Sequence, residues 1–223
     1  MLDKFIYDIT PFSVVDYPDE LAAIVWFAKC NMRCVYCYNK DIVLGEGKFD
    51  MRYLSEFLNS RQNLLSAVVL SGGECTKSLH FSDVLKLAKN LGYKTKVDTN
   101  GSSPEIIEEN LSLVDFISLD FKAPKAKFEA ITASNLYDKF IKTLQTLLKN
   151  RVEFECRTTI HADMLNENDI SDMVKVLSQN GYDKTYYLQN FFESLNLGNL
   201  QKPKTKFDPK LIKSNLNIEL RNF

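Results

Sequence analysis

Three cysteines stand close together near the start of the chain, in the segment Cys30-Asn-Met-Arg-Cys34-Val-Tyr-Cys37. The other two of the five cysteines, Cys75 and Cys156, stand alone, and the odd number argues against a framework of disulfides. Three thiolates can hold three corners of a cubane iron–sulfur cluster and leave the fourth iron without a protein ligand. An iron of that kind is open to a substrate.

A structural zinc ion is the alternative use of the same thiols. Such a site normally has four protein ligands, and His161, Cys75 or Cys156 could supply the fourth. The gaps of three and two residues between the clustered cysteines do not follow the paired pattern of zinc ribbons. The spacing therefore favours an iron–sulfur cluster over zinc.

Three further polar segments follow strand-like runs. They are Ser71-Gly72-Gly73-Glu74, Asp98-Thr99-Asn100-Gly101 and Leu119-Asp120-Phe121-Lys122. Glycines let a ligand approach the backbone, and a glutamate at the end of the first segment can accept hydrogen bonds from an ammonium group. Taken singly, the segments also fit a tight turn or an ordinary ion pair at a strand end.

Alternating strands and helices must position these segments. Strands are expected at residues 21–28, 67–70, 94–98, 116–120, 152–158 and 184–189. Helices are expected from Asp50 to Leu58, at 81–91 before Gly92, from Pro104, at 135–149 after a Ser134 cap, and at 169–180 before Gly181. This alternation requires parallel strands joined by right-handed crossovers.

The length of 223 residues helps to choose between α/β architectures. Each βα unit takes about 30 residues and a closed eightfold barrel about 250, so six units fit better than eight. Polar residues alternate with apolar ones in three of the strands, which a sheet covered by helices on both faces does not show. This alternation puts Lys96 with Asp98, and Asp120 with Lys122, on the polar faces of two of them. We therefore predict an incomplete (βα)6 TIM-like barrel over residues 1–200, with residues 1–20 as an extended lead-in and residues 201–223 as a tail whose structure the pattern does not define.

Composition excludes several classes of function. The 28 lysines and arginines are balanced by 29 aspartates and glutamates, so no excess of positive charge attracts nucleic acid or an anionic membrane. The longest apolar run, residues 21–28, is far shorter than the roughly 20 residues of a membrane helix. The first four residues lack the pattern of a signal peptide. We expect a cytoplasmic protein that binds neither nucleic acid nor membranes.

Together these motifs resemble those of the radical SAM superfamily. The cysteine segment matches the family's CxxxCxΦC motif, with Tyr36 at the aromatic position Φ, and Gly72-Gly73-Glu74 resembles its GGE segment. The DTNG segment from Asp98, the DxK segment from Asp120 and Val15-Asp-Tyr-Pro18 are similar to those of activating enzymes for glycyl radical enzymes. The resemblance is closest to the type that activates anaerobic ribonucleotide reductase, and it spans residues 7–192.

The resemblance implies cofactors, partners and residue roles. Cys30, Cys34 and Cys37 would hold a [4Fe-4S] cluster that cleaves S-adenosylmethionine (SAM) to a 5′-deoxyadenosyl radical. That radical would take a hydrogen atom from a glycine of a partner enzyme, expected to be anaerobic ribonucleotide reductase, with a flavodoxin- or ferredoxin-like protein as electron donor. A monovalent cation is expected near two of the SAM-binding residues, Asp98 and Asp120. The SAM-binding set implied is Tyr36, Gly72, Gly73, Glu74, Asp98, Asp120, Lys122 and Arg157, the last two neutralising the methionine carboxylate.

Two positions depart from the family pattern. Tyr38 stands where relatives usually carry His, and Cys75 where they carry Pro. Neither position is a cluster ligand in the family, so the departures concern subgroup and partner more than chemistry.

Two alternative functions are a small-molecule radical SAM enzyme of the deazaguanine-forming type and a non-catalytic zinc or electron-transfer protein. The second alternative leaves the placement of the GGE, DTNG and DxK segments unexplained.

Overall fold

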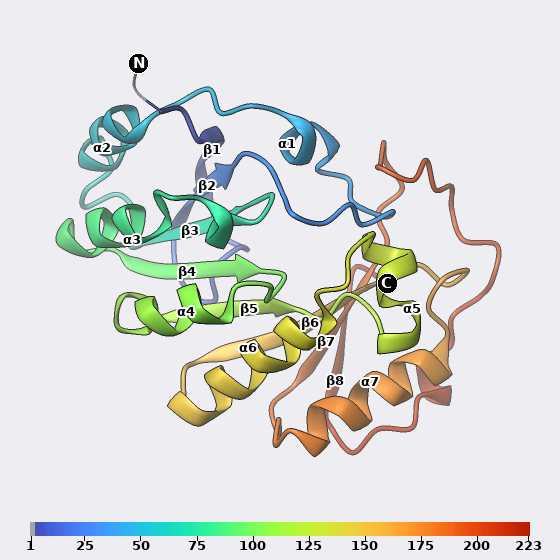
Figure 1. The fold of residues 1–223 in the computed structure, drawn as a ribbon. Coiled ribbons are helices and arrows are strands. Elements are labelled where there is room, and N and C mark those ends of the chain that lie inside the picture. Colours follow the sequence, from blue (N-terminus) through green and yellow to red (C-terminus); the bar gives the residue numbers. More distant parts are fainter. Residues whose placement is uncertain (1–2) are drawn as a thin grey trace. The chain divides into compact units, whose positions relative to one another are not determined.

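Residues 3–223 are described by a computed structural model in which eight strands form one sheet (Figure 1). They follow chain order across the sheet, with the first and last strand at its two edges. Met1 and Leu2, on which the expectation about a signal peptide partly rests, lie outside the described residues. The strands are β1 (Ile6–Ser13), β2 (Ala22–Phe27), β3 (Ala67–Gly72), β4 (Lys94–Thr99), β5 (Phe116–Asp120), β6 (Phe154–Ile160), β7 (Tyr186–Asn190) and β8 (Ile218–Arg221).

The predicted parallel sheet is confirmed. β2, β3 and β4 pair in parallel, with Ala22 opposite Ala67 and Val69 opposite Lys96. β6, β7 and β8 also pair in parallel, with Cys156 opposite Tyr186. The six expected strands correspond to β2–β7, and β5 has the predicted bounds. The fold is the expected incomplete (βα)6 TIM-like barrel, and its sheet is not closed.

Both ends of the chain contain strands that the sequence pattern did not predict. The expected lead-in contains β1, which pairs antiparallel to β2. The expected tail contains a short 3-10 helix, Pro209–Leu211, and then β8, which extends the sheet beside β7. At the end of β8, Arg221 donates to both carboxylate oxygens of Glu155 on β6, at 3.2 and 2.9 Å. The domain boundary at residue 200 stays a prediction.

Five of the helices follow the prediction and two were missed, α1 and α5. The expected Asp50 cap of α2 is confirmed, because its side chain accepts from the Tyr53 amide. The Ser134 cap is wrong: α6 begins later, and the Ser134 hydroxyl lies 3.0 Å from the Thr132 hydroxyl instead. None of these helices in residues 3–223 is long and apolar enough to cross a membrane. Their bounds are α1 (Lys40–Leu44), α2 (Met51–Ser60), α3 (Phe81–Asn90), α4 (Pro104–Asn110), α5 (Lys125–Thr132), α6 (Tyr137–Asn150) and α7 (Glu167–Gln179).

The chain divides into two compact units. Of the described residues, the first unit takes 3–31, 39–99 and 105–118, and the second takes 32–38, 100–104 and 119–223. In the first unit, Tyr17 of the Val15–Pro18 motif packs into a core cluster on β2 and β3. That cluster consists of Tyr17, Ala22, Ile24, Ala67 and Val69, with Trp26 and Phe116 packed against it. One face of these strands is therefore apolar toward their amino ends.

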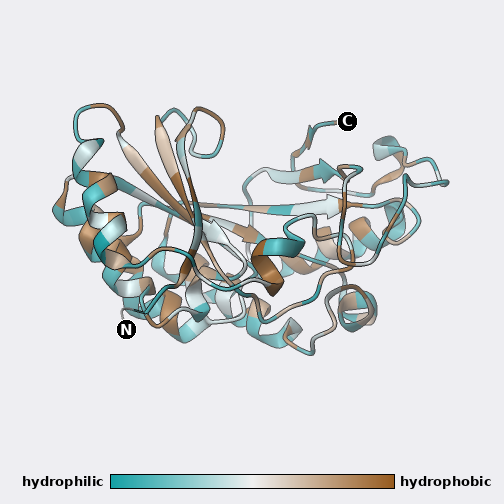
Figure 2. Cartoon of the chain, turned by 90° about the horizontal axis from the view of Figure 1, so that it is seen from above, coloured by the Kyte–Doolittle hydropathy of each residue, from teal (hydrophilic) through white to brown (hydrophobic). Residues whose placement is uncertain are grey.

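In the second unit, α6 buries an apolar stripe that includes Phe140, Leu144 and Leu147. The Phe140 ring stacks on Phe121, directly after β5, with ring centroids 4.4 Å apart. Helices of both units carry hydrophobic and hydrophilic residues together (Figure 2), as expected of helices that cover a sheet on one side.

Candidate functional site

The cysteine segment lies in the connection between β2 and α1. Cys30, Cys34 and Cys37 are not in disulfide bonds; Cys34 is buried and the other two are partly exposed. Cys30 belongs to the first unit, whereas Cys34 and Cys37 belong to the second. Within residues 3–223, no three His, Cys, Asp or Glu side chains are grouped as ligands of a metal ion. Neither unit by itself contains the whole predicted ligand set.

Backbone hydrogen bonds within the second unit hold the later part of this segment. The amides of Arg33 and Val35 donate to the carbonyls of Thr132 and Ile131 at the end of α5, at 2.8 and 3.0 Å. On the other side, the Gly198 amide donates to the Val35 carbonyl at 2.7 Å. A Cβ atom on Gly198 would lie 2.8 Å from that carbonyl oxygen, so this position needs glycine. Two segments distant in sequence therefore fix the backbone between Arg33 and Cys37.

The buried thiol of Cys34 fits a metal ligand better than a reactive nucleophile. Burial raises its pKa to about 11, and the nearby charge of Lys122 only partly opposes that effect. Tyr36, the aromatic residue of the motif, is also buried, and its hydroxyl donates to the Lys122 carbonyl at 3.3 Å. A thiol of this kind becomes a thiolate when a metal replaces its proton. The three cysteine thiols thus have the donor chemistry that an iron–sulfur cluster needs.

In the first unit, the two glycines at the end of β3 lie against the start of the cysteine segment. Gly72 has a positive φ of 113°, and a Cβ atom on Gly73 would lie 1.8 Å from the Lys29 carbonyl oxygen. The Gly73 and Glu74 amides donate to the carbonyls of Phe27 and Lys29, at 2.9 and 3.0 Å. Both glycines are therefore required by packing, a reason that is independent of any ligand.

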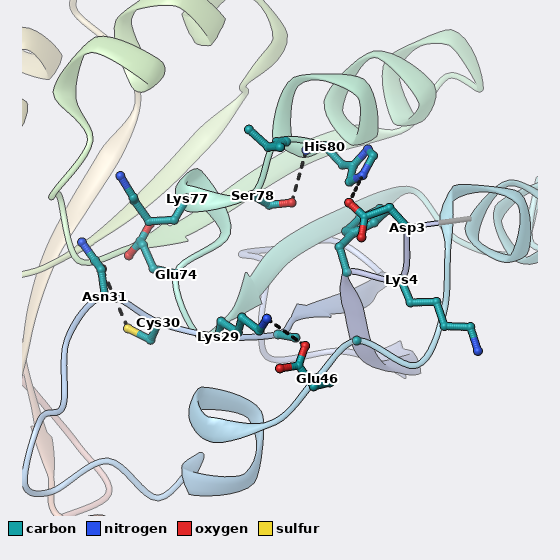
Figure 3. A pocket seen from close by; sticks show the side chains of 14 residues that line it. Asp3, Lys4, Lys29, Cys30, Asn31, Glu46, Glu74, Lys77, Ser78 and His80 are labelled. Carbon is teal, nitrogen blue, oxygen red and sulfur yellow. Dashed lines mark hydrogen bonds and ion pairs between the residues drawn. The ribbon is translucent and has the colours of Figure 1, made fainter. Parts of the chain in front are cut away.

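The Glu74 side chain is buried and held in one orientation. Its Oε1 atom accepts from the hydroxyls of Thr76 and Thr99, at 2.7 and 2.8 Å. Glu74 and Cys30 also line a pocket of about 330 Å³ in the first unit (Figure 3). Asn31 and Lys77 lie at the same end of this pocket in the close-up view. A fixed carboxylate beside a cavity can accept hydrogen bonds from a cationic group.

Asp98, at the end of β4, has a lysine and a serine as partners in the first unit. The Lys96 ammonium lies 2.5 Å from Oδ1, and the Ser71 hydroxyl donates to Oδ2 at 3.1 Å. Cys75, which departs from the family pattern, is fully buried, and its Sγ lies 3.5 Å from the Asp98 carbonyl oxygen. The pKa of the Cys75 thiol is raised well above its usual value, mainly by burial and to a smaller extent by the negative charges of Glu74 and Asp98.

Asp120, at the end of β5, has two cationic partners in the second unit. Lys122 Nζ lies 2.8 Å from Oδ2, and Arg157 Nε lies 2.5 Å from Oδ1. Burial opposes ionisation of Asp120, but the charges of Arg157 and Lys122 outweigh it and hold its pKa well below the usual range. Burial likewise disfavours the charged form of Lys122, yet the Asp120 carboxylate raises the Lys122 pKa well above its usual value. All three groups are charged at neutral pH.

A sequence model of the radical SAM superfamily matches residues 24–178. The chain belongs to the radical SAM superfamily. This radical SAM chain is 34% identical over 178 residues to a Methanocaldococcus jannaschii protein that carries the provisional name glycyl-radical enzyme activating enzyme. The matched residues make up 76% of this chain and 73% of the relative. It is 27% identical over 176 residues to the 7-carboxy-7-deazaguanine synthase of the same organism, covering 70% of each chain.

Among solved structures, the crystal structure of Streptococcus suis SuiB bound to S-adenosylmethionine is similar, with a TM-score of 0.65 and 17% sequence identity. The likeness covers 89% of this chain and 52% of SuiB, so the radical SAM chain spans about half the length of this neighbour. At this level of identity the likeness concerns the fold. Membership of the superfamily implies a [4Fe-4S] cluster and SAM as cofactors, and the thiols of Cys30, Cys34 and Cys37 fit the cluster.

The structure brings some of the predicted residues of the radical SAM chain together and adds others. Asp120 and Lys122 of the DxK segment form one group with Arg157 in the second unit. Sequence reasoning missed Lys96, Ser71 and Thr99 as partners of the predicted acidic residues. The alternation of residues along β4 did place Lys96 and Asp98 on one face, which was the available signal. The roles of all these residues toward a ligand stay predictions.

Proposed function

We propose that this chain is an activating enzyme for a glycyl radical enzyme. The observation that carries the proposal is the 34% identity to a relative of that name, over about three quarters of both chains. The order of the CxxxCxΦC, GGE, DTNG and DxK segments along successive strands supports it. Each segment lies at the carboxyl end of a parallel strand or directly after it, where α/β folds bind their ligands.

The residues of the chain take distinct parts in this proposal. Cys30, Cys34 and Cys37 would hold the cluster. The reduced cluster would supply the electron that splits SAM into methionine and a 5′-deoxyadenosyl radical, and that radical would take a hydrogen atom from the partner's glycine. The Gly72–Glu74 turn would accept hydrogen bonds from the methionine ammonium group, since Glu74 is fixed by two hydroxyls. The group of Asp120, Lys122 and Arg157 carries one negative and two positive charges, which suits it to the methionine carboxylate.

The identity of the partners is the finer part of the proposal. Anaerobic ribonucleotide reductase is the proposed glycyl radical enzyme, because the DTNG and DxK segments resemble the type that activates it. A flavodoxin- or ferredoxin-like protein is proposed as electron donor, since the cluster must work near the low end of the range of about −700 to +450 mV. A cytoplasmic location also stays a prediction. The resemblance implies a monovalent cation near Asp98 and Asp120 as well, but the Lys96 ammonium already lies 2.5 Å from the Asp98 carboxylate.

Anaerobic reconstitution with iron and sulfide tests the enzymatic part of the proposal. We expect about four irons per chain and cleavage of SAM to 5′-deoxyadenosine in the presence of a reductant. Cys34→Ala should lose both the cluster and the cleavage. Cys75→Ala is the matched control: its thiol is buried and bonded to the Leu70 and Asp98 carbonyls, so iron content should be retained. One zinc per chain without cleavage would rule the enzyme out.

Coexpression with a glycyl radical enzyme encoded beside this chain in the genome tests the identity of the partner. A glycyl radical doublet in the electron paramagnetic resonance spectrum of that enzyme, absent with Cys34→Ala, is the expected result. The similarity to 7-carboxy-7-deazaguanine synthase favours a second candidate, a small-molecule radical SAM enzyme. For that candidate, 5′-deoxyadenosine would acquire deuterium from a deuterated small metabolite, and no doublet would form.

A further inference from the structure

Lys96 places an ammonium group inside the first unit, next to the apolar cluster of β2 and β3. It lies on β4 opposite Val69, which in turn lies opposite Ile24 on β2. Its side chain is only 3% exposed. A buried ammonium is strongly destabilising unless it is paired and hydrogen-bonded. The position of Lys96 therefore depends on a fixed anionic partner.

That partner is Asp98, two residues further along the same strand. The Lys96 Nζ to Asp98 Oδ1 distance is 2.5 Å, and the Asp98 carboxylate is itself only 12% exposed. The second oxygen, Oδ2, accepts from the Ser71 hydroxyl at 3.1 Å. The two donors come from neighbouring strands, β4 and β3, and both reach the carboxylate from within the first unit. Asp98 is thus neutralised and oriented by residues of the chain.

A free metal cation at Asp98 would meet this ammonium at close range. Two like charges a few ångströms apart repel strongly where water is largely excluded. The carboxylate also has a single negative charge, which Lys96 already balances. We propose that Lys96 is the built-in counter-ion of Asp98 and takes the place of a monovalent cation there, so that the chain binds SAM without potassium or sodium.

The proposal has two parts that can fail separately. The pairing of Lys96 with Asp98 concerns the protein alone. The statement about SAM rests on the proposed function, and in it Lys96 is a positioning residue that acts through Asp98. The experiments below therefore measure the protein without cofactors first and SAM binding second.

Thermal unfolding of the full chain without cofactors tests the first part. Wild type should melt at the same temperature in choline, sodium and potassium chloride at a matched ionic strength of about 0.1 M. Lys96→Met should melt roughly 6–20 °C lower in choline chloride, because it breaks the buried ion pair with the Asp98 carboxylate. Potassium or sodium, but not choline, should restore part of that loss. A wild-type protein that potassium stabilises specifically would overturn the proposal.

Lys94→Met is the matched control on the same strand. Lys94 is largely exposed and pairs with Glu20, so its loss should change the melting temperature by at most about 4 °C, equally in all three salts. Lys96→Arg retains the charge and should show no specific response to potassium. The double variant Lys96→Met with Asp98→Asn removes both charges, and it should be more stable than Lys96→Met in choline chloride. If the double variant is no more stable, Asp98 is not the group that Lys96 neutralises.

Equilibrium dialysis with labelled SAM and the reconstituted holoprotein tests the second part. Wild type should bind SAM equally well in choline and potassium chloride, whereas Lys96→Met should bind about tenfold more weakly in choline and recover in potassium. A tenfold loss of wild-type affinity in choline would overturn the proposal and leave the proposed function standing. Absence of SAM binding in every salt would instead overturn the proposed function, while the melting data would still decide whether Lys96 pairs with Asp98.

Discussion

The two units each hold an aspartate at the end of a parallel strand, and they neutralise it differently. In the first unit, Asp98 meets one ammonium, that of Lys96, and one hydroxyl. In the second unit, Asp120 meets both Lys122 and Arg157. The Lys96–Asp98 pair has no net charge, whereas Asp120, Lys122 and Arg157 together have a net charge of +1. The net positive charge suits the second group to the anionic ligand proposed for it.

The two lysines also differ in position and in exposure. Lys96 precedes Asp98 within β4, and its side chain is 3% exposed. Lys122 follows Asp120 after the end of β5, and its side chain is 19% exposed. The same two-residue spacing thus occurs in two ion pairs of different exposure, and the pair of Lys96 and Asp98 is the more deeply buried.

The largest expected effect concerns stability. Lys96→Met should lower the free energy of unfolding by about 3–5 kcal/mol, since it breaks the buried ion pair with the Asp98 carboxylate. Lys122→Met should lower it by only about 1–2 kcal/mol, because Arg157 still pairs with Asp120. Urea unfolding followed by circular dichroism measures both values. Equal losses in the two variants would contradict the distinction between a structural and an accessible pair.

The contrast between the aspartates was only partly visible in the sequence. Alternation along the strands put Lys96 with Asp98, and Asp120 with Lys122, on polar faces, because a strand repeats every two residues. The run of strand-forming residues gave the bounds of β5, and the spacing of the three cysteines placed them on one connection. Sequence reasoning could not tell which lysine is buried, since burial depends on neighbouring strands and on the loops that cover them.

Contacts between distant segments account for what was missed. β8 is short and lies in a polar tail, and it is a strand because it pairs with β7 and because Arg221 reaches Glu155. The bond from Gly198 to the cysteine segment joins residues more than 150 positions apart, with no local pattern at either end. Such contacts depend on the assembled fold rather than on local propensity or periodicity.

A smaller effect concerns the binding of SAM, and it tests whether the positive charge of the second unit attracts the methionine carboxylate. Lys122→Met and Arg157→Met should each weaken SAM binding about tenfold, or about 1.4 kcal/mol, through loss of an attraction to the methionine carboxylate. Equilibrium dialysis of the reconstituted protein in potassium chloride measures the affinity. Lys175→Met, on an exposed ion pair of α7, is the control and should leave it unchanged. If both site variants bind SAM as tightly as wild type, the methionine carboxylate does not bind to Lys122 and Arg157.

The smallest effect is a dependence of stability on acid, and it isolates Asp120. Because the pKa of Asp120 is held well below its ordinary value of 3.8, its ionised form stabilises the folded protein at neutral pH. That contribution is complete above the ordinary pKa and is lost as the pH falls below it, at no more than about 1.4 kcal/mol per pH unit for one proton. Asp120→Asn lacks it at every pH, so the gap in stability between wild type and variant should narrow as the pH falls from 6 toward 3. Urea unfolding at a series of pH values measures the gap, and a gap that stayed constant would show that Lys122 and Arg157 do not hold the carboxylate ionised.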